Sequence, residues 1–501
     1  MFSIKIFDEV IAVHIYEINT WTWLNDLSRK EKRAITLDSV PEDALASIQN
    51  MGIDAIWLMG VWERSPKGRK IALEHPDLQA EYRRVLPDFV PEDVVGSPYA
   101  VHRYEVDPHL GGRVGLINLR QRLKKMGIQL ILDFVPNHVA LDHPWLMEFP
   151  DAFVQGTVAE QTFDPKSFFR AGQYIFAHGR DPYYPAWTDT AQANAFSKTY
   201  RRLATETLLE ISSLCDGVRC DMAMLLTNEI FAKTWSLNRV GAIPSQEFWV
   251  EIIQAVKHVR PEFFFIAEVY WDMEFTLQQQ GFDYCYDKRF YDRVVHDSAG
   301  SINAHLQAEL SYQQKLVRFI ENHDEPRAIT TLGLERSKMA AVLIATLPGA
   351  KLWHEGQFQG HKIKLPVQLG RRPKESSNAQ LYAFYRKLLV EAQDSVYQLG
   401  AWVRRNVIPA WPGNESNGNL IAYTWEQGND RRLIVVNYSN TLSQGRVPIT
   451  NFGLEPILWK LTDVLNNAVY EREGHRMVTD GLYIELEPFH AHIFHFEPIP
   501  S

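Results

Sequence analysis

Two carboxylates and one arginine in the middle of the chain have the residue types and spacing of a catalytic group. Asp221 ends the short run Gly217–Asp221, and Arg219 stands two residues before it. Residues two apart on a β-strand share a face, so these side chains point the same way. A neighbouring cation keeps a carboxylate ionised, which suits a nucleophile. Glu268 ends the apolar run Phe263–Glu268, where lost hydration favours a protonated carboxyl group.

A structural ion pair at the end of a buried strand is the competing interpretation of Arg219 and Asp221. Two more strand ends carry polar groups, in the stretches Asp133-Phe134-Val135-Pro136-Asn137-His138 and Phe319-Ile320-Glu321-Asn322-His323-Asp324. Four polar strand ends are hard to explain by capping and packing alone. Retaining glycoside hydrolysis needs an ionised carboxylate as nucleophile and a protonated carboxyl as acid, about 5 Å apart. Asp221 and Glu268 suit these two roles.

The elements that would position these groups alternate along the chain. Eight short apolar runs are predicted to be strands: Val10–Glu17, Ala55–Leu58, Gln129–Val135, Gly217–Asp221, Phe263–Val269, Phe282–Tyr286, Leu316–Ile320 and Ala350–Trp353. Helical patterns between them cover Pro41–Met51, Gly115–Met126, Thr199–Ser213, Ser245–Val259 and Arg336–Thr346. Eight such units predict an α/β fold, a (β/α)8 TIM barrel with its site at the carboxyl ends of the strands.

Two stretches interrupt the alternation and indicate added domains. Residues 139–215 are predicted to form an inserted domain after the third strand, with a strand-turn-strand pattern over Gln173–Trp187. Residues 397–501 are predicted to form a C-terminal all-β sandwich. The barrel would then consist of residues 1–138 and 216–396.

The composition bounds the class of protein. Of the 501 residues, 46% are hydrophobic and 23% are charged, as in ordinary globular proteins. The net charge of −9, with basic residues spread along the chain, argues against a nucleic-acid partner. Three cysteines favour a reducing compartment, and we find neither a signal-peptide core nor an apolar run of about 18 residues. We therefore expect a cytoplasmic protein with no membrane partner, of unknown oligomeric state.

The four strand-end motifs, in their order and spacing, resemble those of the α-amylase superfamily of glycoside hydrolases and transglycosylases. The resemblance covers the barrel, from about residue 10 to residue 395. It implies that Asp221 is the nucleophile, that Glu268 is the general acid/base, and that Asp324 is a third carboxylate that binds and distorts the sugar. It further implies substrate-binding roles for four residues, namely Tyr99, His138, Arg219 and His323.

The same resemblance implies finer features and shows departures. Tyr99 would stack on the sugar ring, and Asn137 matches an asparagine that holds a structural calcium ion in many members. The chemistry itself would need no cofactor. Arg103 stands where many members have an aspartate, and Met224 and Leu225 replace a Lys-His pair of many starch-degrading members. These departures put starch endo-hydrolysis in doubt.

The expected function is retaining hydrolysis of α-glucosidic bonds in oligo- or polysaccharides, with an α-linked sugar as the partner. An α-glucan transglycosylase using the same residues is the nearest alternative. A metal-dependent hydrolase is another, with ligands from Asp133, His138, His323 and Asp324. A barrel serving as a non-catalytic subunit is a third. The sequence does not distinguish between sugars, linkages, or endo and exo action.

Overall fold

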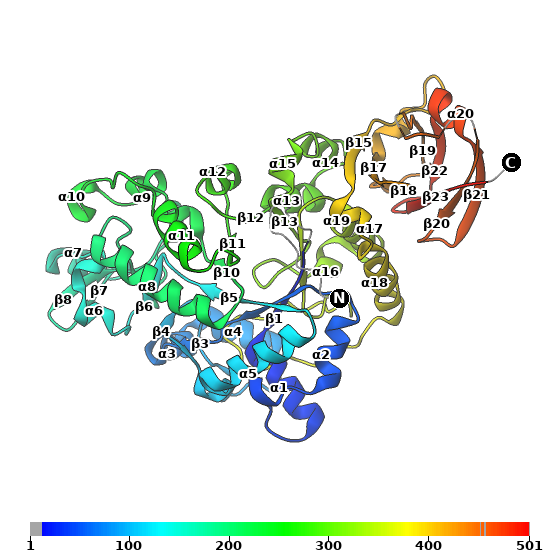
Figure 1. The fold of residues 1–501 in the computed structure, drawn as a ribbon. Helices are drawn as coiled ribbons and strands as arrows, with labels where there is room; N and C mark the ends of the chain where they lie inside the picture. Colours follow the sequence, from blue (N-terminus) through cyan, green and yellow to red (C-terminus); the bar gives the residue numbers. More distant parts are fainter. Residues whose placement is uncertain (1–12, 451, 455–456, 500–501) are drawn as a thin grey trace. The chain divides into compact units, whose positions relative to one another are not determined.

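The fold is described by a computed structural model that covers residues 13–450, 452–454 and 457–499. Eight parallel strands close into a barrel in the order β1-β14-β13-β12-β11-β10-β5-β2 (Figure 1). The barrel strands are β1 (His14–Asn19), β2 (Ala55–Met59), β5 (Gln129–Phe134), β10 (Gly217–Cys220), β11 (Phe264–Ala267), β12 (Tyr284–Tyr286), β13 (Leu316–Arg318) and β14 (Ala350–His354). The predicted barrel and its eight strands are confirmed, while residues 10–12 of the first predicted strand lie outside the described residues.

The helices between these strands follow the predicted pattern. Their bounds are α2 (Glu42–Gln49), α5 (Gly112–Lys125), α8 (Lys198–Leu214), α11 (Phe248–Val259) and α17 (Leu334–Thr346). Barrel strands are covered on both faces, which explains why β2 is apolar and buried at every position. Helix α8 begins where Ser197 Oγ accepts the backbone N–H of Tyr200, as an N-cap does.

The described chain packs as two compact units, and each has its own elements. The first unit comprises Ile15–Tyr286 and Ile363–Lys374. Besides its barrel strands it contains α1 (Thr20–Glu31), β3 (Trp62–Arg64), α3 (Pro66–Glu74), α4 (Pro76–Val85), β4 (Val101–Val106), α9 (Asn228–Thr234), α10 (Leu237–Val240) and α12 (Glu274–Gln279). The second unit holds β13, β14, α13 (Lys288–His296), α14 (Ala299–His305), α15 (Leu310–Gln313), α16 (Ala328–Leu332), α18 (Ala379–Ala392) and α19 (Val396–Leu399).

A segment of the first unit, residues 138–192, interrupts the barrel pattern after β5 and is called the inserted segment. It contains β6 (His138–Ala140), α6 (Trp145–Glu148), α7 (Val158–Phe163), β7 (Phe168–Ala171), β8 (Tyr174–Ala177) and β9 (Thr190–Gln192) (Figure 1). Strand β6 pairs with β9, and β7 forms a hairpin with β8. The predicted strand-turn-strand over Gln173–Trp187 is correct in its first strand, which is β8. That strand pairs with β7, however, across a turn at Gly172, whose positive φ of 55° favours glycine. The second predicted strand is replaced by an isolated antiparallel bridge between Gly179 and Trp187.

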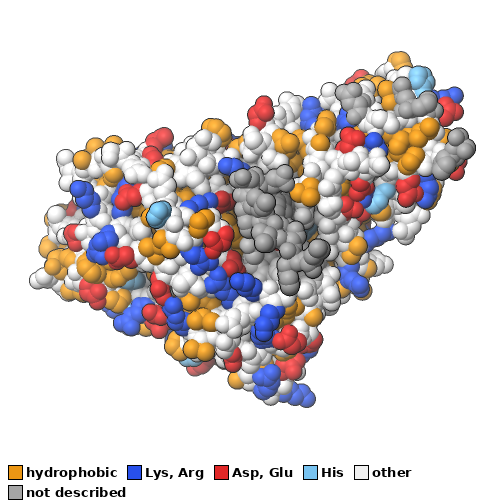
Figure 2. Space-filling view, viewed as in Figure 1, with side chains coloured by type: hydrophobic (Ala, Val, Ile, Leu, Met, Phe, Trp, Pro, Cys, Tyr) orange, Lys and Arg blue, Asp and Glu red, His pale blue; other side chains and the backbone are white. Residues whose placement is uncertain are grey.

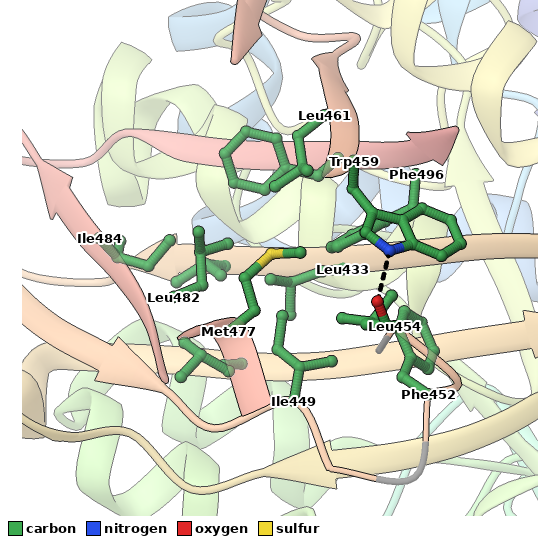
Figure 3. Close-up of a cluster of buried hydrophobic side chains, with 14 of the residues drawn as sticks. Leu433, Ile449, Phe452, Leu454, Trp459, Leu461, Met477, Leu482, Ile484 and Phe496 are labelled. Atoms are coloured by element: carbon green, nitrogen blue, oxygen red, sulfur yellow. Dashed lines mark hydrogen bonds between the residues drawn. The ribbon is translucent and has the colours of Figure 1, made fainter. Parts of the chain in front are cut away.

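The C-terminal region consists of antiparallel sheets, as predicted. A six-stranded sheet has the order β15-β17-β18-β23-β20-β21, and a three-stranded sheet the order β16-β19-β22. Their bounds are β15 (Ala401–Arg405), β16 (Ile408–Pro409), β17 (Leu420–Gln427), β18 (Asp430–Asn437), β19 (Ser443–Val447), β20 (Leu458–Asp463), β21 (Ala468–Glu473), β22 (Leu482–Leu486) and β23 (Ala491–Pro498), with the short helix α20 (Gly474–Arg476). Side chains from both sheets share one apolar core, in which the indole N–H of Trp459 donates to Leu454 O at 2.7 Å (Figure 3).

The surface mixes charges of both signs. On the face shown in Figure 2, Lys and Arg side chains alternate with Asp and Glu side chains rather than forming a stripe. Among the described residues, none of the helices has the length and apolar character that crossing a membrane requires.

Candidate active site

Three neighbouring barrel strands bring the predicted catalytic residues of the first unit together. Strand β10 lies between β5 and β11, and Arg219 is in register with Asp133 on one side and with Ile266 on the other. Asp221 and Glu268 directly follow β10 and β11, and the ladder continues through them. The N–H of Asp221 donates to Phe134 O at 2.8 Å, and that of Glu268 to Cys220 O at 3.0 Å. The backbone therefore fixes both residues at the carboxyl ends of their strands.

One buried guanidinium links these carboxylates. Arg219 Nη1 lies 2.9 Å from Asp221 Oδ1 and 3.8 Å from Asp133 Oδ1, and Nη2 lies 2.7 Å from Glu268 Oε2. The side chain of Arg219 is 1% exposed. Burial opposes its charge, but the carboxylates of Glu268 and Asp221 outweigh burial and raise the pKa of Arg219 well above its usual value. Arg219 is thus a permanent cation between two strand-end carboxylates.

Three aromatic rings surround the same guanidinium. Its central carbon lies 5.2 Å from the ring centroid of Trp57, 5.3 Å from that of Tyr99 and 5.8 Å from that of Tyr286. Such contacts are attractive because the ring faces are electronegative. Tyr99 was predicted as a site residue, whereas Trp57 and Tyr286 were missed. A usable signal was present: both are large aromatic residues within predicted barrel strands, and Tyr286 ends its strand.

Glu268 is held by two further donors. The N–H of Met222 donates to Glu268 Oε2 at 2.7 Å, and the hydroxyl of Tyr270 donates to Oε1 at 2.8 Å. Met222 has a φ of 45°, in the left-handed region that non-glycine residues seldom adopt. Strained backbone of this kind clusters at functional sites. Tyr270 was missed by the sequence analysis, although its position two residues after Glu268 was a hint that the two side chains share a side.

His138 belongs to the same unit and contacts Tyr99. Its Nε2 lies 3.1 Å from Tyr99 O, and its ring packs on Trp187 at 5.1 Å. Burial lowers the pKa of His138 to about 4, so the ring is neutral near pH 7. A neutral ring that donates its Nε2–H to a carbonyl fixes the backbone of Tyr99. The predicted contact of His138 with sugar hydroxyls stays a prediction.

The remaining predicted residues, Asp324 and His323, form a pair within the second unit. Asp324 Oδ2 lies 2.9 Å from His323 Nε2, and Asn322 Oδ1 accepts the backbone N–H of Asp324 at 2.9 Å. The side chain of Asp324 is 46% exposed and that of His323 only 3%. Asp324 therefore presents a carboxylate to solvent from a fixed turn.

The positions that depart from the family pattern have contrasting environments. Met224 and Leu225 follow β10 and are buried, at 0% and 2% exposure. They pack in the interior and offer no polar group, in place of a Lys-His pair. Arg103 is exposed on β4.

Several known proteins resemble this chain in sequence. Residues 41–381 match the family model of the alpha amylase catalytic domain. Alpha-amylase MalA of Haloarcula japonica is 26% identical over 443 residues, covering 85% of this chain and 55% of that protein. A cyclomaltodextrinase of Geobacillus thermopakistaniensis is 23% identical over 368 residues, covering 69% of this chain and 57% of that protein. The chain thus spans little more than half the length of these curated relatives.

Solved structures show the same fold. A maltogenic alpha-amylase, AmyB from Thermotoga neapolitana, superimposes with a TM-score of 0.69 at 20% identity, covering 97% of this chain and 98% of that one. An alpha-amylase from Lactobacillus plantarum superimposes with a TM-score of 0.67 at 18% identity, covering 96% and 98%. Because the catalytic-domain model matches well over half of the sequence, the chain belongs to the alpha-amylase family.

Proposed function

We propose that the protein is a retaining glycoside hydrolase that cleaves α-glucosidic bonds of oligo- or polysaccharides by double displacement. One observation carries the proposal: Asp221 and Glu268, at the ends of adjacent strands, bind the two terminal nitrogens of one guanidinium. A shared guanidinium favours a short separation of the two carboxyl groups. Retaining enzymes have them about 5 Å apart, whereas inverting enzymes leave a wider gap for water.

In the first step Asp221 attacks the anomeric carbon while Glu268 gives its proton to the departing glycosidic oxygen. The bond from carbon to that oxygen breaks, and a bond from carbon to the Asp221 carboxylate forms. Arg219 keeps Asp221 ionised for this attack. A phenolic hydroxyl can donate or accept, so the contact between Tyr270 and Glu268 Oε1 persists when Glu268 is protonated.

In the second step Glu268, now ionised, takes a proton from water as the water oxygen attacks the anomeric carbon. The bond to Asp221 breaks, and both carboxyl groups return to their starting states. Asp324 is proposed as the third carboxylate, which would bind the sugar through its partly exposed side chain. Tyr99, His138 and His323 are proposed as substrate-binding residues on the resemblance to the family.

The test of this function compares three single substitutions. We expect Asp221→Asn and Glu268→Gln to lower kcat by roughly 10³-fold or more, since each removes a group of the covalent mechanism. Asp216→Asn is the matched control. It lies at the other end of the same strand, where Asp216 pairs with Arg120 at 2.6 Å and accepts the N–H of Leu130. Its kcat should be unchanged. Unchanged turnover in Asp221→Asn or Glu268→Gln would end the proposal.

Transfer to an acceptor sugar is a second candidate activity, which an aromatic surface favours. The ring of Tyr183 packs edge-on against Trp271, with centroids 4.9 Å apart, and Tyr183 and Tyr184 are 56% and 69% exposed. Trp271 follows Glu268 by three residues and has a φ of 63°. Aromatic faces bind the apolar faces of sugar rings, and a bound acceptor competes with water for the intermediate. Products longer than the substrate, formed with excess acceptor by the wild type but not by Tyr183→Ala, would support transfer.

The proposed setting is a reducing compartment such as the cytoplasm. Cys215, Cys220 and Cys285 are buried free thiols, which supports this setting.

A further inference from the structure

The side-chain amide of Gln192, in β9 of the inserted segment, lies among three oxygen atoms. Its Nε2 donates to Asn137 O at 2.8 Å, to Asn137 Oδ1 at 3.0 Å and to Ala193 O at 3.1 Å. Gln192 is 0% exposed and Asn137 1%. An amide nitrogen carries two protons, so at least one proton is shared between two of these oxygens. The three oxygens therefore converge on a single point that a positive group must fill.

The orientation of this amide follows from its other end. Gln192 Oε1 accepts the backbone N–H of Arg180 at 3.1 Å. In the reversed orientation the amide oxygen would face three acceptors, and the amide nitrogen would face an N–H. Hydrogen bonding thus selects the orientation in which the nitrogen faces the three oxygens.

Converging main-chain and amide oxygens are also the surroundings that calcium takes, with six to eight oxygen ligands. The residues present here do not fit that ion. The centre of the oxygen cluster holds the nitrogen of Gln192, and the side chain of Asn137 contacts the Gln192 amide and the His138 ring rather than a carboxylate. Across the parts of the chain that the structure covers, no group of three or more His, Cys, Asp or Glu could hold a metal.

Gln192 also joins segments that the candidate site depends on. It lies in β9 and pairs with His138 of β6, whose ring contacts the carbonyl of Tyr99. Through its side chain it binds Asn137, directly before β6, and Arg180 of the inserted segment. The amide therefore links Arg180 and β9 of the inserted segment to Asn137, which lies between β5 and β6.

We propose that the Gln192 amide takes the place of a structural calcium ion in this chain, so that the inserted segment is fixed without a metal. The proposal concerns folding and does not rest on the proposed hydrolase activity. Its readout is thermal unfolding, which is independent of any substrate.

The first experiment uses the full-length wild-type protein. It is treated with the chelator EGTA, dialysed, and unfolded thermally with and without added Ca²⁺. A protein with no folded-state calcium site gains nothing from the ion, so we expect Tm to agree within about 1 °C in all samples. A lower Tm after EGTA that Ca²⁺ restores would overturn the proposal.

The second experiment converts the amide into a ligand. Gln192→Glu replaces the donor nitrogen by a carboxylate oxygen among three acceptors, which repel it unless a cation binds. We expect Tm of this variant to fall without metal and to rise by roughly 3 °C or more at saturating Ca²⁺. A folded variant whose Tm does not respond to Ca²⁺ would contradict the idea that these oxygens form a cation site. If the variant does not fold, the chelator experiment on the wild type still decides.

Gln313→Glu is the matched control. Gln313 is also 0% exposed, and its Nε2 donates to Leu306 O at 3.3 Å and Ala308 O at 2.7 Å. Its Oε1 accepts from Arg318, whose guanidinium supplies the positive charge that a cation would. We expect Gln313→Glu to show no calcium response. A response equal to that of Gln192→Glu would show that the effect is not specific to the Asn137 cluster, against the proposal.

Discussion

Two buried arginines of this protein each bind three carboxylates, yet their surroundings differ. The Arg219 group, in the first unit, contains Asp133, Asp221 and Glu268. The Arg432 group, in the second unit, contains Glu391, Asp394 and Asp430. Arg219 is 1% exposed and Arg432 is 3% exposed. Burial and charge are therefore alike in the two groups.

The difference lies in where the carboxylates come from. Those of the Arg219 group stand in or directly after three adjacent parallel strands, at their carboxyl ends. Those of the Arg432 group come from helix α18, the turn after it and the first residue of β18. In a TIM barrel the carboxyl ends of the strands carry the chemistry. A buried arginine with three carboxylates therefore indicates, by itself, only a stabilising ion cluster. The position of the carboxylates at the carboxyl ends of barrel strands is what indicates function.

The partners of Glu391 show what a structural group looks like. His495 Nε2 lies 2.9 Å from both of its oxygens, and the hydroxyl of Tyr397 lies 2.8 Å from Oε1. Burial opposes ionisation of Glu391, but His495 and Arg432 outweigh it and lower the pKa of Glu391 below its usual value. The Arg432 group thereby ties α18 to the C-terminal sheet.

The largest difference in kcat is expected between two arginine-to-lysine variants, one in each group. Arg219→Lys keeps the charge but loses the planar fork that binds two carboxylates at once. We expect kcat to fall about 100-fold, because the nucleophile and the acid/base lose their shared partner. Arg432→Lys should leave kcat of the folded enzyme unchanged and lower its thermal stability. The comparison fails if Arg432→Lys lowers kcat as much as Arg219→Lys does.

Glu391→Gln tests the structural role of the Arg432 group through the pH dependence of stability. Because the folded-state pKa of Glu391 is lowered, its contribution to stability is fully present above the unfolded value of 4.5 and is lost as pH falls through the folded value. We expect Glu391→Gln to cost about 3 kcal/mol of unfolding free energy at pH 7, since it breaks a buried ion pair. Denaturant unfolding should show this difference shrinking below pH 4.5. A difference in unfolding free energy that stays constant down to pH 3 would contradict a stabilising role for the ionised Glu391 carboxylate.

Tyr270→Phe is expected to have the smallest effect, and it tests whether Tyr270 positions the acid/base. Losing one hydrogen bond to a charged group should lower kcat about tenfold. The loss should be greater on substrates with poor leaving groups, which depend most on proton donation by Glu268. Tyr385→Phe, which removes a hydroxyl bonded to Gln357 in the second unit, is the control and should keep full activity. An equal loss on all leaving groups would argue for a merely structural role.

The sequence predicts the barrel strands and the pairing of Arg219 with Asp221, because both follow from the local pattern of residues along the chain. The spacing of two residues placed Arg219 and Asp221 on one face, and the structure puts their side chains 2.9 Å apart. The apolar run before Glu268 likewise indicated a buried carboxyl group, and Glu268 is 3% exposed.

The contacts that the sequence could not predict depend on long-range packing. Tyr99 reaches Arg219 from a turn more than a hundred residues away in the chain. The hydrogen bond from Met222 to Glu268 requires a left-handed backbone at a methionine, for which no local signal exists. The amide of Gln192 binds Asn137 only because β6 pairs with β9 in this register.

Trapping of the glycosyl-enzyme intermediate would identify the nucleophile. A 5-fluoro-α-glucosyl fluoride loses its anomeric fluoride as the nucleophile attacks, and the second fluorine slows the hydrolysis that follows. After proteolysis, mass spectrometry should find the added sugar on the peptide that contains Asp221, and no adduct should form in Asp221→Asn. An adduct on another carboxylate, or rapid turnover with inversion of the anomeric centre, would contradict the assignment of Asp221 as the nucleophile paired with Glu268 through Arg219.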